Sequence, residues 1–162
     1  ASCLVGSEMC IRDSIKGRIN AILEQVNRDN RGAQLVLSRT SPQMLTALMQ
    51  KEVPEIAEQI IEIRDVARQP GLRAKISVKT NDHRIDPVGA CIGMRGTRIQ
   101  AVQQELDGER IDVVVWSDDP VQYIISALEP ADVDRIILDE DTKTADIIFA
   151  TNDQLALSLI HI

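Results

Sequence analysis

The sequence predicts an α+β fold, and three observations support this prediction. Between Val53 and Trp116 the spacing of apolar residues changes from helical to alternating and back, which gives the order helix, strand, strand, helix, turn, helix, strand. Two stretches, Arg73–Thr80 and 111–115, alternate in the way that half-buried strands do. A Gly-x-x-Gly turn at 93–96 separates the last two helices.

The composition of the chain limits its class and its partners. Its 162 residues are enough for one ordinary domain or a few small ones, and an apolar content of 44% allows globular cores. Aromatic residues make up only 2%, so aliphatic side chains must form those cores. The net charge of −7 argues against a protein that coats nucleic acid without specificity. Residues 64–98 are nevertheless basic, because this segment has only three acidic residues and eight basic ones. The basic residues are Arg64, Arg68, Arg73, Lys75, Lys79, Arg84, Arg95 and Arg98.

The chain shows no sign of a membrane segment or of an oxidising compartment. No long uncharged apolar run is present, and the first residues lack the order of a signal peptide. Cys3, Cys10 and Cys91 are odd in number and have neither a CxxC pair nor metal-ligand spacing. We therefore expect a cytoplasmic protein without metal or cofactor, in which Cys91 is a small buried apolar residue.

Two strands are expected near the start of the chain. Residues 1–14 have no clear periodicity and are interpreted as a tail that is not native to the domain. Residues 15–26 and 33–38 have strand patterns on either side of a polar turn at 27–32. They predict a β-hairpin, which needs a larger sheet or another partner because a lone hairpin is marginally stable in water.

Two helix starts follow, and proline marks each of them. Ser41 is an expected N-cap, and Pro42 is the first residue of its helix. A second helix is expected from Pro54, because apolar residues recur there at helical spacing. The members of this stripe are Val53, Ile56, Ala57 and Ile60.

The central sheet is expected to begin with a strand over 61–67, a turn at 69–71 and the strand Arg73–Thr80. A third strand over 111–115 follows the turn at 107–108. In the middle strand one face should be buried and the other exposed to solvent. We expect Ala74, Ile76 and Val78 to point inward and Lys75, Ser77 and Lys79 to point outward.

A second unit of similar order begins after this sheet. A helix from Pro120 and strands over 133–138 and 145–150 precede a last apolar segment, which Thr151 or Asn152 caps. The order helix, strand, strand, helix thus starts again and then stops. We interpret this second unit as truncated.

The turn at 93–96 has a chemistry that suits a nucleic-acid backbone. Glycine tolerates the backbone angles of a tight turn and leaves no Cβ between the main chain and a ligand. The second helix begins here, so its free N–H groups and the positive end of its dipole face the same place. Arg95 and Arg98 add positive charge. The alternative is a purely structural turn, because two glycines three residues apart are common.

The order of elements around this turn resembles the type II (prokaryotic) KH domain. The run Val88-Gly-Ala-Cys-Ile-Gly-Met-Arg-Gly-Thr-Arg-Ile99 lies within residues 74–113, which are similar to the first KH domain of the NusA family of bacterial transcription elongation, termination and antitermination factors. Residues 32–39 resemble the closing strand of that family's OB-fold barrel. Residues from 130 onward resemble the opening of its second KH domain.

This resemblance implies a domain organisation and a function. Residues 15–40 would be the C-terminal part of an OB-fold barrel, 41–117 a type II KH domain (α-β-β-α-α-β) with its leading helix, and 118–157 a truncated second KH domain. Residues 158–162 would be an appended tail. The fragment would hold single-stranded nascent RNA at the Gly-x-x-Gly turn and so modulate pausing, termination and antitermination. RNA polymerase and other elongation-complex factors would be partners of the full-length protein.

The resemblance also assigns roles to individual residues. The glycines would let the RNA backbone approach closely, Met94 would cover a sugar or base, and Arg95 would pair with a phosphate. Ile92, Ile99 and Ile76 either line the binding groove or belong to the core. The candidate RNA-binding residues are Gly93, Met94, Arg95, Gly96, Arg98, Ile92 and Lys79.

No set of residues suggests an enzyme. His83 and His161 are the only histidines, and no serine or cysteine lies in a nucleophile motif. The alternative to RNA binding is therefore a module for protein–protein interaction. In that case the basic segment 64–98 and the acidic stretch 132–141 would contact charged partners.

Overall fold

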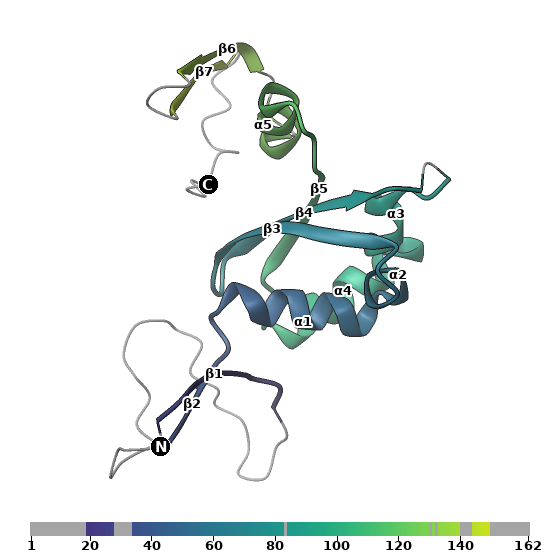
Figure 1. Ribbon diagram of the computed structural model, residues 1–162, viewed down its shortest axis with the longest axis vertical. Helices are drawn as coiled ribbons and strands as arrows, with labels where there is room; N and C mark the ends of the chain where they lie inside the picture. Colours follow the sequence, from purple (N-terminus) through teal and green to yellow (C-terminus); the bar gives the residue numbers. More distant parts are fainter. Residues whose placement is uncertain are drawn as a thin grey trace.

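The computed structural model describes residues 19–27, 34–82, 84–129, 131, 133–139 and 144–149. The predictions for both tails, for the last apolar segment, and for His83, Cys3 and Cys10 lie outside these ranges. Within them the chain folds as an α+β protein with a central three-stranded sheet (Figure 1).

The predicted N-terminal hairpin is confirmed in β1 (Ile22–Val26) and β2 (Leu35–Ser38). The two strands pair antiparallel as a sheet of their own, with a bulge between Leu23 and Gln25. Large apolar side chains of both strands are exposed, among them Leu23, Val26, Leu35 and Leu37. Residues 15–18 of the expected first strand are outside the described part of the chain.

The first helix, α1 (Pro42–Glu52), begins as predicted. The Ser41 side chain accepts a hydrogen bond from the Gln43 N–H, and Pro42 occupies the first turn. The next helix, α2 (Pro54–Ala57), is shorter than expected. It ends because Gln59 adopts a left-handed φ of 60° and turns the chain toward the sheet. The expected stripe is therefore correct for Val53 and Ile56, which are buried, but wrong for Ala57 and Ile60, which are exposed.

The central sheet has the order β3–β4–β5. Strands β3 (Ile61–Gln69) and β4 (Arg73–Thr80) pair antiparallel, whereas β4 and β5 (Arg110–Val115) pair parallel. A parallel pair needs a crossover connection. The helices α3 (Pro87–Ile92) and α4 (Thr97–Glu105), with the Gly-x-x-Gly turn between them, form that connection.

The main core lies between the sheet and helices α1 to α4, which cover the same face (Figure 1). Ala74, Ile76 and Val78 of β4 are completely buried there, as predicted. They are joined by apolar residues of all four helices, including Met44, Leu45, Met49, Ile56, Cys91, Ile99 and Val102. This core fixes the helix pair that carries the turn.

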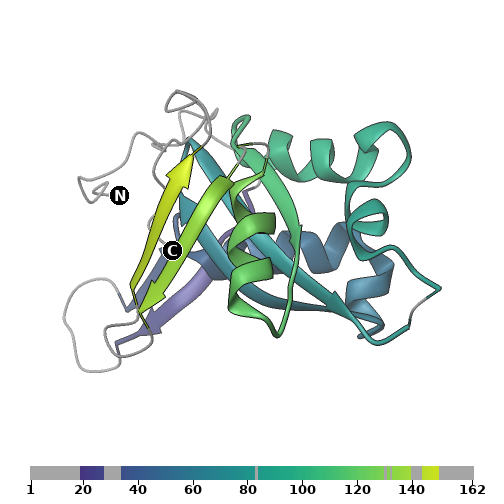
Figure 2. The same ribbon diagram turned by 90° about the horizontal axis from the view of Figure 1, so that it is seen from above.

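The opposite face of the sheet is partly covered by α5 (Pro120–Leu128), which lies on the other side from α1 and α4 (Figures 1 and 2). Ser77 was expected to point to solvent, but it is buried with only 3% of its surface exposed, since Tyr123 and Ala127 pack nearby. Lys75 points outward as expected, yet its Nζ donates a hydrogen bond of 2.6 Å to the Ala127 carbonyl oxygen. The outer face is therefore a second, smaller packing surface.

Strands β6 (Val133–Asp139) and β7 (Thr144–Phe149) form the predicted second hairpin. They pair antiparallel with a bulge between Val133 and Arg135. Asp119 caps α5 by accepting a hydrogen bond from the Val121 N–H, in agreement with the expected helix start. In the described part of the chain, no helix is long and apolar enough to cross a membrane.

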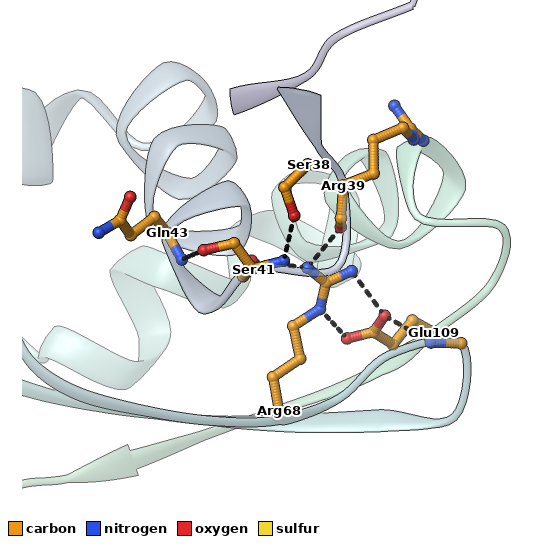
Figure 3. A network of polar contacts seen from close by, with 7 residues as sticks. Ser38, Arg39, Ser41, Gln43, Arg68 and Glu109 are labelled. Atoms are coloured by element: carbon orange, nitrogen blue, oxygen red, sulfur yellow. Dashed lines mark hydrogen bonds and ion pairs between the residues drawn. The ribbon is translucent and has the colours of Figure 1, made fainter. Parts of the chain in front are cut away.

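A buried ion pair connects the sheet to the start of α1 (Figure 3). Arg68 and Glu109 have no exposed side-chain surface, and their closest contact, Nε to Oε1, is 2.8 Å. The Nη1 of Arg68 also donates to the carbonyl oxygens of Arg39 and Ser41, while Glu109 accepts from the Gly71 N–H. No local pattern in the sequence predicted this network.

A second arginine connects the N-terminal hairpin to α4. Arg39 donates to the Asn20 carbonyl oxygen, to the Glu105 carboxylate and to the Glu105 carbonyl oxygen. Burial by itself raises the pKa of Glu105, but the hydrogen bonds from Asn20 and Arg39 outweigh this effect and lower it. The hairpin is thus attached to the end of α4 that lies farthest from the Gly-x-x-Gly turn.

Candidate nucleic-acid interface

The backbone of residues 93–96 forms a tight turn with three left-handed residues. Gly93 and Gly96 have φ values of 75° and 76°, which glycine adopts without strain. The Gly93 N–H closes α3 by donating to the Gly89 carbonyl oxygen at 2.9 Å. The Gly96 N–H donates to the Gly93 carbonyl oxygen at 3.1 Å. The turn is therefore held by its own backbone hydrogen bonds.

Between the two glycines, Met94 and Arg95 project from the protein. The side chain of Met94 is 87% exposed, and Arg95 is also exposed. Within the described ranges, neither the N–H groups of these two residues nor the Arg95 guanidinium has a hydrogen-bond partner or an ion pair. The turn thus presents an apolar side chain, one cation and two N–H donors at the N-terminal end of α4.

Arg95 itself has a left-handed backbone, with φ 54° and ψ 26°. This conformation is uncommon for residues other than glycine and tends to occur at functional sites. This conformation could not be predicted from the sequence, because arginine has no preference for positive φ.

Gly93 is required for a second reason, which is its contact with Arg98. A Cβ at this position would lie 2.8 Å from Arg98 Cγ. The Arg98 side chain has little freedom to move away, because its Nη1 donates to the Ala90 carbonyl oxygen at 2.6 Å and to Glu55 Oε2 at 2.9 Å. Arg98 was a candidate phosphate ligand, and the structure instead places it beneath the turn as a support.

Gly96 differs from Gly93 in its surroundings. A Cβ at Gly96 would have Gln100 Nε2 as its nearest neighbour at 3.5 Å, which is an ordinary contact. Only the positive φ therefore requires glycine at this position.

The three candidate isoleucines fall into two groups. Ile76 is completely buried and Ile99 is 8% exposed, so both belong to the core rather than to an open groove. Ile92, at the end of α3 beside the turn, is among the exposed large apolar residues. Of the three, only Ile92 is available to a ligand.

Lys79 lies on the opposite face of the sheet from α3 and α4. Its neighbour Val78 points into the core with the helices, so alternation along β4 directs Lys79 the other way. Its Nζ is 3.1 Å from Asp118 Oδ2 and 4.3 Å from the centroid of the Trp116 ring. The structure therefore does not bring Lys79 to the turn.

The basic segment 64–98 is less free than its composition suggests. Six of its eight cations form ion pairs, namely Arg64, Arg68, Lys75, Lys79, Arg84 and Arg98. Arg73 and Arg95 form none with the described residues. Since Arg73 begins β4 at the other end of the sheet, Arg95 is the available cation at the turn.

Cys91 is confirmed as a buried residue with no exposed surface. Burial, together with the nearby Glu55 carboxylate, raises the pKa of its thiol to about 11. The thiol therefore remains protonated at neutral pH and acts as an apolar residue of the core beneath α3.

An exposed Gly-x-x-Gly turn between two helices that pack on a three-stranded sheet is the arrangement of a KH domain. Comparison with protein-family models supports this class, because residues 39–116 match the family described as NusA-like first KH domain. The chain is 45% identical over 140 residues to the transcription termination/antitermination protein NusA of Rickettsia prowazekii (strain Madrid E). It is 46% identical over 140 residues to the protein of the same name from Rickettsia conorii (strain ATCC VR-613 / Malish 7). The chain belongs to the NusA family.

These alignments cover 85% of this chain and 28% of each relative, so the chain spans less than a third of the length of the curated proteins it matches. The names of both relatives are those of transcription factors, in agreement with the expectation that the chain is not an enzyme. The resemblance inferred from residues 74–113 is confirmed.

Proposed function

We propose that this chain is an RNA-binding part of a transcription termination/antitermination factor, and that the turn at 93–96 holds single-stranded nascent RNA. The observation that carries the proposal is the exposed pair Met94 and Arg95, whose N–H groups and guanidinium have no partner in the described structure. The NusA-like KH domain supports the same assignment. RNA polymerase and other factors of the elongation complex are the proposed partners of the longer protein, in the cytoplasm.

The proposed mechanism is a clamp on the RNA backbone. The two glycines leave space for a sugar-phosphate to approach the main chain, Arg95 pairs with a phosphate, and the free N–H groups donate to its oxygens. Met94 and Ile92 supply apolar contact for a base or sugar. A KH unit holds about four nucleotides, and the scarcity of aromatic residues here suggests modest affinity and weak sequence preference.

The domain organisation that we propose follows the same family. Residues 41–117 would be a type II KH domain, which is consistent with the parallel pairing of β4 and β5. The hairpin β1–β2 would belong to an OB-fold barrel over 15–40, and α5 with β6–β7 would begin a second KH domain over 118–157. Tandem units would act as one longer RNA surface, because linked sites raise the effective local concentration.

The double substitution Met94→Asp/Arg95→Asp tests the clamp. It leaves both glycines in place, so we expect an unchanged melting temperature, because exposed substitutions usually alter stability by only about 0.5 kcal/mol. Binding of single-stranded RNA should fall at least tenfold, since two carboxylates would face a phosphate where like charges commonly cost several kcal/mol. Fluorescence anisotropy of labelled RNA at low salt, together with thermal unfolding, measures both effects.

The matched control is Leu72→Asp/Arg110→Asp. Leu72 and Arg110 are also an exposed apolar residue and an exposed arginine, and the change in charge is the same. The Arg110 N–H donates a hydrogen bond to the Leu72 carbonyl oxygen, near the end of α4 that lies farthest from the turn at 93–96. If both double variants bind RNA equally well, or lose binding equally, the turn at 93–96 is not the RNA site.

The single substitution Arg95→Gly should separate charge from conformation. Glycine relieves the positive φ of 54°, so stability should stay the same or increase slightly. Loss of one phosphate contact should reduce the slope of log affinity against log salt by about 0.7 for single-stranded RNA. Titrations at several salt concentrations measure this slope. An unchanged slope would mean that Arg95 does not contact a phosphate.

A further inference from the structure

A cluster on the outer face of the sheet has no role in the clamp. It consists of Arg64 on β3, Lys79 on β4 and Trp116 directly after β5, and we name it the Trp116 platform. Arg64 Cζ and Lys79 Nζ lie 5.3 Å and 4.3 Å from the centroid of the Trp116 ring. The Trp116 N–H donates to the Val78 carbonyl oxygen at 2.9 Å, which extends the pairing of β4 with β5 by one residue. All three strands thus contribute to one surface.

The platform is accessible, whereas α5 covers the part of this face around Ser77. Tyr123 and Ala127 of α5 pack over Ser77, but Trp116 precedes α5 and is half-exposed. The carboxylates that pair with its cations are themselves exposed, 81% for Asp118 and 57% for Glu62. Exposed ion pairs are weak, so a phosphate can exchange with either carboxylate.

The chemistry of the platform matches that of a nucleotide. A base stacks well on an indole ring or on the planar guanidinium of an arginine, and a lysine ammonium pairs with a phosphate. Trp116 is the single tryptophan in a chain with one tyrosine and one phenylalanine. Lys79 and Glu62 also border a cavity of about 470 Å³, whose other lining residues come mainly from α1, α2 and the start of β3.

We propose that the Trp116 platform is a second contact site for single-stranded RNA, which takes a nucleotide of the same strand that the turn clamps. This inference rests on the proposed function. The C-terminal end of β5 connects the two sites. β5 is an edge strand of the sheet, and α3, which leads into the turn, contacts it. Val115 is exposed and points to the face that carries α3 and α4, while Trp116 points to the other face. A strand that leaves the turn reaches the platform by crossing this end of β5.

The intrinsic fluorescence of Trp116 reports on the platform directly, because no other tryptophan is present. We expect an RNA of about twelve nucleotides to quench this fluorescence in parallel with the anisotropy signal of the bound RNA. A tetranucleotide is long enough to occupy the turn, because a KH unit holds about four nucleotides, but it is too short to reach the platform as well. It should therefore bind without quenching at concentrations that saturate the turn.

The variant Arg64→Gln/Lys79→Gln removes both cations and keeps the tryptophan. We expect roughly tenfold weaker binding of the longer RNA and unchanged binding of the tetranucleotide. The control variant Lys51→Gln/Arg110→Gln removes the same charge from exposed positions on α1 and at the start of β5. It should bind both RNAs nearly as the unaltered protein does.

Two results would overturn the proposal: fluorescence that does not change while the longer RNA saturates the protein, or equal losses for both RNA lengths in Arg64→Gln/Lys79→Gln. Failure of the proposed function would look different. In that case the tetranucleotide would bind equally well to the unaltered protein and to Met94→Asp/Arg95→Asp, or to neither. Quenching of Trp116 by the longer RNA in the Met94→Asp/Arg95→Asp variant would support the platform independently of the turn.

Discussion

Replacing Glu109 with glutamine is expected to lower the free energy of unfolding by about 3–5 kcal/mol, because it leaves the guanidinium of Arg68 buried without a counter-charge. Both side chains are completely buried, and glutamine has nearly the same size as glutamate. Its NH₂ group would also face N–H donors of Arg68 or Gly71, which now donate to the carboxylate. Urea unfolding of both proteins measures the difference.

The exposed pair Arg64–Glu62 on the same strand is the matched control. Its Nη2–Oε2 distance of 3.2 Å is similar, but its side chains are 40% and 57% exposed. We therefore expect Glu62→Gln to cost at most about 1 kcal/mol. If Glu109→Gln and Glu62→Gln lower the free energy of unfolding equally, burial does not determine the contribution of the Arg68–Glu109 pair to stability.

An apolar replacement of the buried pair should recover only part of the loss. In other proteins, apolar residues of similar volume can replace a buried ion pair without loss of stability. Here, Arg68→Met/Glu109→Leu would also remove the Arg68 hydrogen bonds to the carbonyl oxygens of Arg39 and Ser41, of which the Ser41 oxygen keeps the Met44 N–H as a donor. A double variant as stable as the unaltered protein would show that these two hydrogen bonds contribute little.

Helix starts were predictable from the sequence because their rules are local. Ser41 and Asp119 each accept a hydrogen bond from an N–H two residues later, and a proline follows each of them. The buried face of β4 was predictable for a similar reason, since alternation places Ala74, Ile76 and Val78 on one side.

Features that depend on distant parts of the chain could not be predicted. The burial of Ser77 requires α5, and the partner of Arg68 lies 41 residues away in the sequence. The stripe that starts at Val53 has helical spacing, but the tertiary structure ends α2 after one turn so that Ile61 can enter the core.

In the candidate site, too, local features could be predicted from the sequence, whereas contacts with distant parts of the chain could not. The sequence located the turn through its two glycines, and the resemblance assigned RNA contacts to Met94 and Arg95, which are exposed between them. It ranked Arg98 behind Arg95 as a phosphate ligand, but it did not indicate that Arg98 supports the turn. That supporting role depends on Glu55, which approaches from a different helix.

Substituting alanine for each glycine of the turn should have very different effects. Gly96→Ala meets only the strain of a positive φ, so we expect a loss of about 1–2 kcal/mol. Gly93 combines φ 75° with ψ 173°, a region that is essentially restricted to glycine, so Gly93→Ala is more strained than Gly96→Ala. Its new Cβ also lies 2.8 Å from Arg98 Cγ. Overpacking of this kind typically costs a further amount of about 1–3 kcal/mol. Chemical denaturation of the two variants measures the difference.

The Arg98→Ala background shows whether that contact is the cause. With alanine at position 98, the new Cβ at position 93 loses its closest contacts, 2.8 Å to Cγ and 3.0 Å to Cδ, and keeps only the 3.2 Å contact with Cβ, while the positive φ is unchanged. Arg98→Ala alone should destabilise the protein, because it removes the hydrogen bonds to Glu55 and to the Ala90 carbonyl oxygen. In this background, however, the extra cost of Gly93→Ala over Gly96→Ala should become smaller, since mainly the difference in backbone strain remains. If Gly93→Ala stays the more costly change by its full margin, the loss does not arise from Arg98.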